Sequence, residues 1–189
     1  RLFIREVLRV GGSDAGDALI PVLGHWNWGA AIVLCQEAKK AKLGPNFTAA
    51  LGAIAVDDSL PADRAYLREV AIQALGQYAT WSQTDAKQIL INAALDEGLS
   101  RNIRKLVIKE LGGAFKFMGA GNVHDDKEIA ETLIQLLDNS AIAIRNKTHE
   151  ALVGGHLNSG WFDTGIPETS WVTFDPSARR VDRQDFITQ

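Results

Sequence analysis

The side chains that most often carry chemistry are scarce in this chain of 189 residues. The histidines and cysteines together number five: His25, Cys35, His124, His149 and His156. His149 and His156 are seven residues apart and could share one face of a helix, but a zinc site would need further ligands there. The run from His124 to Asp126 is better explained as the start of a helix, where acidic side chains are favoured. We therefore predict no metal site and no cofactor.

Motifs of catalysis are also missing from the sequence. It contains no HExxH pattern, no glycine-rich phosphate loop and no GxSxG nucleophile turn. Cys35 lies in the apolar run Ala-Ile-Val-Leu-Cys-Gln, a setting in which a thiol is usually an unreactive part of the core. We therefore expect no catalytic residue, and a protein that is not an enzyme.

The composition predicts a globular protein with a real core. Apolar residues make up 46% of the chain and charged residues 23%, and the net charge is −3. Such a charge argues against binding nucleic acid by bulk charge. A single cysteine excludes a disulfide framework, and no apolar run is long enough to cross a bilayer, so we expect no membrane partner. The cytoplasm is slightly favoured. The start at Arg1 without a signal-like segment suggests a fragment or a processed chain.

Three segments align without gaps over ten residues and predict a helical repeat. They begin at Arg68, Arg104 and Arg145, and each has a leucine seven residues later. The arginines are 36 and 41 residues apart, which fits a repeat of two helices. A glycine follows each leucine within two positions: Gly76, Gly112 and Gly154. Since glycine in a helix costs about 1 kcal/mol relative to alanine, we expect neighbouring helices to approach closely at these positions.

Apolar spacing of three and four residues predicts about four helix pairs. The first helices of the pairs are predicted at 14–23, 47–56, 85–97 and 128–139. The second helices are predicted at 30–42 and 62–78 and in the segments that carry Arg104 and Arg145. Residues 1–10 would be the second helix of an incomplete pair. Residues 119–124 are predicted to form an exposed loop.

The pattern of an arginine and a Leu-Gly on the second helix, after a first helix that ends in Leu-Asp, resembles HEAT repeats, especially the short bacterial type. The resemblance covers residues 45–156 well and 14–42 loosely. It implies an all-α fold, namely an α-solenoid of about four antiparallel helix pairs over residues 1–157. It also implies a ladder of aspartate–arginine pairs along the stack. The matching pairs are Asp96 with Arg104, Asp138 with Arg145 and, less cleanly, Asp57 with Arg64 or Arg68.

The last part of the chain, residues 158–189, breaks the repeat. Glycines and prolines interrupt any helix there, so we expect an irregular C-terminal tail that packs on the last repeat or links to another domain. The chain has five tryptophans: Trp26, Trp28, Trp81, Trp161 and Trp171. We interpret those near the turns as plugs in the seams between repeats, although aromatic side chains at such places can also anchor a ligand.

Charge is unevenly divided between the two predicted helix layers. The first helices sum to −10 and the second helices to +7. Much of this charge has a structural explanation, because acidic side chains stabilise helix N-termini. Among the basic residues of the second helices, the best surface candidates for binding a partner are Lys39, Lys40, Arg101, Lys105 and Lys109. Lys105 and Lys109 are one helical turn apart, so they are predicted to share a face.

These observations predict a noncatalytic scaffold for protein–protein interaction. Its second-helix face would bind a partner protein or an adjacent domain of the parent chain. One alternative is binding of a nucleic-acid backbone by the local basic patch. Another is an accessory repeat segment of a larger enzyme. Alkylpurine DNA glycosylases and phycobilin lyases carry similar repeats, but no motif in this sequence supports either activity.

Overall fold

The computed structural model describes residues 2–24, 28–118, 127–159 and 175. Within these residues the regular structure is entirely helical, with eight α-helices and one short 3-10 helix, which confirms the predicted all-α class. The chain divides into two compact units, Arg1–Leu90 and Ile91–Gln189. Each unit is described separately below.

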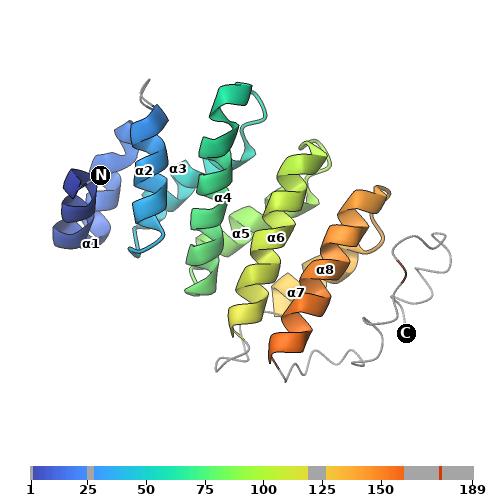
Figure 1. The fold of residues 1–189 in the computed structure, drawn as a ribbon. Helices are drawn as coiled ribbons and strands as arrows, with labels where there is room; N and C mark the ends of the chain where they lie inside the picture. The colour runs from blue at the N-terminus through green and yellow to red at the C-terminus, as the bar shows by residue number, and fades with distance from the viewer. Residues whose placement is uncertain (1, 25–27, 119–126, 160–174, 176–189) are drawn as a thin grey trace. The chain divides into compact units, whose positions relative to one another are not determined.

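The first unit consists of four α-helices and the start of a fifth. They are α1 (Leu2–Leu23), α2 (Trp28–Ala38), α3 (Pro45–Val56), α4 (Ala65–Thr80) and α5 (Thr84–Leu95), with the 3-10 helix η1 (Ala62–Arg64) before α4. Helix α1 packs on α2 and α3, and α4 packs on the same two helices (Figure 1). The second helices of successive predicted pairs, α2 and α4, therefore contact each other directly.

The core of the first unit is closed by a buried tyrosine. Tyr78 on α4 is fully buried, and its hydroxyl donates a hydrogen bond to the carbonyl of Ala38 at 3.2 Å. The same carbonyl also accepts the N–H of Ala41, so the bond from Tyr78 joins α4 to the turn at the end of α2. The ring of Trp81 stacks on Tyr78 with 5.9 Å between centroids, so this tryptophan covers the core at the end of α4. Trp28 is exposed, and Trp26, Trp161 and Trp171 lie outside the described residues.

Helix α1 contains a break at Gly12. The backbone there has φ 54° and ψ −136°, a conformation that favours glycine because it has no Cβ. The break separates two helical segments in the places predicted for helices at 1–10 and 14–23. The first segment leaves Leu2, Phe3 and Val10 exposed.

The second unit contains the end of α5 and the helices α6 (Arg101–Met118), α7 (Lys127–Leu136) and α8 (Ile142–Ser159). Helix α6 packs along α8, and α7 packs against both (Figure 1). At Gly112 on α6, an added Cβ would lie 2.6 Å from the Cβ of Ala151 on α8. The predicted close approach at this glycine is confirmed. The surroundings of Gly154 lie outside the described part of the chain.

Several predicted boundaries differ from the structure at their ends. Helix α2 ends at Ala38 instead of residue 42, because Lys40 and Ala41 form hydrogen-bonded turns to Glu37 and Ala38. Helix α7 ends at Leu136, three residues early, and α8 continues to Ser159, two residues into the predicted tail. The rest of that tail apart from residue 175, and the predicted loop at 119–124, lie outside the described residues.

Candidate partner-binding groove

The turns before three of the second helices share one hydrogen-bond motif. A side-chain oxygen accepts a hydrogen bond from the backbone N–H two residues later, which is an Asx turn. At Asp57 the hydroxyl of Ser59 also donates to the carboxylate, and the hydrogen bonds from this hydroxyl and from the backbone N–H of Ser59 lower the pKa of the carboxyl below its usual value. This Asx turn thus directs the chain from each first helix into the second. The three turns are Asp57 to Ser59 at 3.0 Å, Asp96 to Gly98 at 2.8 Å and Asn139 to Ala141 at 3.0 Å.

The three repeat arginines bond to backbone carbonyls at the ends of the first helices and in these turns. A cation at a helix C-terminus satisfies carbonyls that have no helical partner. Each arginine therefore holds its second helix against the end of the first helix of the same pair, or against the turn that follows it. Arg68 donates to the carbonyl of Asp57, Arg104 through Nε to that of Ala94 at 3.0 Å, and Arg145 to those of Asn139 and Ser140 at 2.7 and 2.9 Å.

This geometry corrects one expected member of the aspartate–arginine ladder. Arg104 does not pair with the carboxylate of Asp96, because that carboxylate accepts the N–H of Gly98 while Arg104 bonds to the carbonyl of Ala94. In this tight turn the guanidinium reaches a backbone carbonyl, while the carboxylate is already bonded to a backbone N–H of the turn. The aspartate in this position shapes the turn, and the arginine caps the helix.

A groove of about 620 Å³ lies between α6 and α8. Its lining side chains belong to these two helices in equal number: Asn102, Lys105, Leu106, Lys109, Ala143, Asn146, Lys147 and Glu150. Each α6 position is 41 residues before an α8 position, the same offset that separates Arg104 from Arg145. The groove is therefore built from four repeat positions, used once on each helix.

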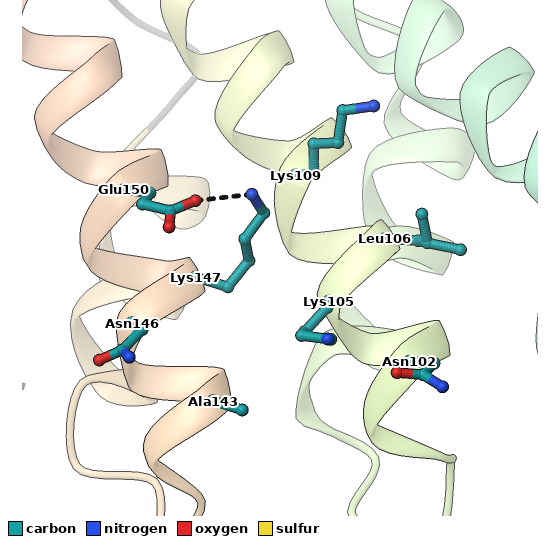
Figure 2. Close-up of a pocket in the computed structure, with 8 residues that line it drawn as sticks. All are labelled: Asn102, Lys105, Leu106, Lys109, Ala143, Asn146, Lys147 and Glu150. Carbon is teal, nitrogen blue, oxygen red and sulfur yellow. Dashed lines mark hydrogen bonds and ion pairs between the residues drawn. The ribbon is translucent and has the colours of Figure 1, made fainter.

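The groove carries three lysines and one glutamate. Lys105 makes no ion pair or hydrogen bond with any described residue, whereas Lys109 lies 3.7 Å from Glu110. Lys147 donates to Glu150 at 2.6 Å. Figure 2 shows Lys105 and the Lys147–Glu150 pair in the space between the two helices, and Lys109 pointing away from α8. The groove is thus cationic, with one acidic side chain inside it.

The structure brings together two of the five predicted binding residues. Lys105 and Lys109 line the groove, while Arg101 is exposed at the first residue of α6 and is not among the lining residues. Lys39 and Lys40 belong to the first unit, where Lys39 donates to the side chain of Gln73 and Lys40 pairs with Glu37 at 3.0 Å.

Sequence reasoning did not select four polar residues of the groove: Asn102, Asn146, Lys147 and Glu150. A signal for the three on α8 was present in the repeat alignment. Asn146, Lys147 and Glu150 occupy the repeat positions of Lys105, Leu106 and Lys109. The side-chain types differ between the two repeats, so a search for clustered charge alone does not find them.

The equivalent surface of the first unit is bridged by side chains. Between α2 and α4, Gln36 donates to the hydroxyl of Tyr66 at 3.3 Å, and Lys39 donates to Gln73. Tyr66 and Gln73 stand 36 residues before two groove residues, Asn102 and Lys109, which is the offset between Arg68 and Arg104. The first unit thus uses these repeat positions for internal bonds, whereas the second unit leaves them open.

The described residues contain no group of three or more potential metal ligands. Cys35 is fully buried, and burial raises the pKa of its thiol to about 12. His25 and His124 lie outside the described part. No helix in that part is both long and apolar enough to cross a membrane.

Comparison with known proteins finds no relative that would suggest a ligand for this groove. No family model, no curated protein and no solved structure matches the chain.

Proposed function

We propose that this chain is a noncatalytic interaction module and that the groove between α6 and α8 binds a segment of a partner protein or of an adjacent domain. The observation that carries this proposal is the cationic lining, built from four repeat positions on each helix and not bridged from one helix to the other. Concave surfaces between packed helices are common binding sites.

The proposed architecture is an α-solenoid of HEAT-like antiparallel helix pairs. Two features support it within the separate units. Second helices of successive pairs pack directly on each other, α2 on α4 and α6 on α8. The Asx turn and the capping arginine also recur at the turns of three pairs. A helix pair that cannot bury its apolar face alone gains a core by such stacking.

A protein partner fits the groove better than nucleic acid does. Grooves that bind single-stranded nucleic acid combine positive charge with aromatic side chains on which bases stack. The described lining contains no aromatic residue and no arginine. With a net charge of −3, the chain as a whole also lacks the positive field that attracts a polyanion.

Site-specific photocrosslinking tests the proposal. A photoreactive amino acid at Asn146 places the probe in the groove, and the same amino acid at the exposed Glu131 on α7 serves as the control. We expect discrete protein adducts from position 146 that are absent from position 131 and are lost when Lys105→Glu is added. The same adducts from both positions, or adducts with nucleic acid alone, would contradict the proposal.

A further inference from the structure

The cationic side chains of the groove have a spacing that selects a particular ligand geometry. Lys105 and Lys109 are one turn apart on α6, so their Cβ atoms lie about 5–6 Å from each other. In an extended peptide, side chains two residues apart point to the same side and are separated by about 6.6–6.8 Å. Two carboxylates separated by one residue in an extended segment therefore match the two lysines.

The length of the groove fits a short extended segment. From Asn102 to Lys109 the lining covers eight residues of helix, and the first and last are about 10 Å apart along the axis. Three extended residues cover about the same distance. The groove thus accommodates an acidic residue, a spacer and a second acidic residue, without requiring a longer ordered partner.

The other polar groups of the groove fit a peptide backbone. The side chains of Asn102 and Asn146 are exposed, and neither makes a hydrogen bond with another described residue. An amide side chain both donates and accepts hydrogen bonds, as a peptide group does. The two asparagines, one on each helix, therefore offer partners for the main chain of a segment whose carboxylates reach the lysines.

Lys105 and Lys109 can bind a ligand without losing a strong interaction within the chain. Lys105 has no partner among the described residues, and the contact of Lys109 with Glu110 is long, at 3.7 Å, with the lysine side chain 55% exposed. An exposed side chain changes rotamer within nanoseconds, so Lys109 can turn from the orientation in Figure 2 toward a ligand. Neither lysine has to give up a strong internal ion pair.

We propose that the groove recognises an extended acidic segment of a partner protein in which two carboxylate residues are separated by one residue. This inference rests on the proposed function, because it names the class of partner for the same groove. Lys105 and Lys109 would bind the two carboxylates, and the two asparagines would bind the main chain of the segment.

Fluorescence anisotropy with the full chain tests this inference. The probe is a fluorescein-labelled peptide with the core Glu-Ser-Glu, flanked by glycine and serine. The matched peptides have Gln-Ser-Gln, or two glutamates separated by three serines. We expect the Glu-Ser-Glu peptide to bind about fivefold or more tightly than either matched peptide at low salt, and to weaken as salt increases.

The protein variants assign the binding to the groove. Lys105→Glu is expected to weaken binding of the Glu-Ser-Glu peptide about fivefold or more. The control is Lys127→Glu, the same charge change at a side chain that is 80% exposed on α7 and does not line the groove. This control should change the affinity less than about twofold. Equal far-UV circular dichroism spectra show that both variants fold.

Other outcomes would overturn the inference. Equal binding of the Gln-Ser-Gln peptide, or no effect of Lys105→Glu, would show that the two lysines do not recognise carboxylates. Tighter binding of an oligothymidylate probe that is lost in Lys105→Glu would overturn the proposed function as well. Self-association through the groove, detected by sedimentation, would replace the acidic segment by a second copy of the chain. If groove crosslinks persist but the peptide does not bind, only the acidic-segment inference fails.

Discussion

At the scale of single residues, Glu150 opposes the ligand that the groove is proposed to bind. It is the acidic member of the lining and accepts a hydrogen bond from Lys147 at 2.6 Å. Because Glu150 lies in the same groove as Lys105 and Lys109, its negative charge repels the carboxylates of the ligand. We predict that Glu150→Gln increases the affinity for the Glu-Ser-Glu peptide about two- to threefold, as expected for an exposed charge interaction. Anisotropy titration measures the change, and unchanged or weaker binding would contradict it.

Arg104 is a second residue with a specific prediction, this time for stability. Its side chain is buried, and Nε bonds to the carbonyl of Ala94 at 3.0 Å. Arg104→Ala removes this bond and leaves a buried carbonyl without its donor, so we expect a loss of about 2–3 kcal/mol. The control is Arg101→Ala, three residues earlier on the same helix and exposed, which should change stability by less than about 0.5 kcal/mol. Urea unfolding followed by circular dichroism compares the two variants. Equal stabilities would show that Arg104 does not anchor α6.

Residue types and their spacing predicted two lysines of the groove, but not the side chains from the neighbouring helix that lie beside them. Lys105 and Lys109 were predictable because a separation of four residues on a helix places side chains on one face. Lys147 joins them only because α6 and α8 pack side by side, which the pattern of a single helix does not contain. The bond of Lys39 to Gln73 was equally hidden, since it depends on how α2 packs against α4.

At the scale of helices, two adjacent glycines on α6 should respond in opposite directions to the same substitution. A Cβ at Gly112 would lie 2.6 Å from Ala151, whereas a Cβ at Gly113 meets nothing within 4 Å. We predict that Gly112→Ala destabilises the protein by about 1–3 kcal/mol, because the packing of α6 on α8 must open. Gly113→Ala should stabilise it by about 0.5–1 kcal/mol through helix propensity. Thermal unfolding of the two variants gives the signs, and a stabilising Gly112→Ala would disprove the close approach.

The helices themselves were largely predictable, but their ends were not. Apolar periodicity predicted the described helices because each one buries one face. The end of α2 was placed four residues late, since the residues after Ala38 look helical by composition. In the structure they form turns, and Pro45 at the start of α3 disfavours a helical conformation for the residue before it. The carbonyl acceptors of the arginine caps were also missed, because backbone carbonyls carry no sequence signature.

At the scale of the whole chain, the division of charge between helix layers has a local meaning. The sum of +7 on the second helices suggests a continuous basic face. In the first unit, however, Lys40 pairs with the buried Glu37, and Lys39 bonds to Gln73. In the second unit, Arg104 and Arg145 are buried as caps. In the groove, Lys105 has no partner among the described residues and the contact of Lys109 with Glu110 is long, so these two lysines keep charge for a partner and the binding prediction is specific to that place.

The single thiol of the chain reports on the folding of the first unit. Burial raises the pKa of Cys35 from 9.0 to about 12. The folded protein therefore keeps the thiol neutral at a pH at which the unfolded chain ionises it. The stabilising contribution is fully present below pH 9 and is lost as the pH rises from 9 toward 12. At about pH 10 the loss is roughly 1 kcal/mol, because the unfolded chain is then about one pH unit above the ordinary pKa of the thiol.

A matched variant separates this contribution from the other titrating groups. Cys35→Ala creates a small cavity whose cost does not depend on pH, so its stability deficit relative to the parent chain should shrink by roughly 1 kcal/mol between about pH 8 and pH 10. Urea unfolding at the two pH values measures the difference. In the same experiment, a thiol reagent at the lower pH should modify Cys35 only after unfolding. The thiolate is the reactive form, and burial in the folded chain disfavours the thiolate. Rapid modification of the folded chain, or a deficit that stays constant with pH, would show that the helices around Cys35 open far more readily than their packing implies.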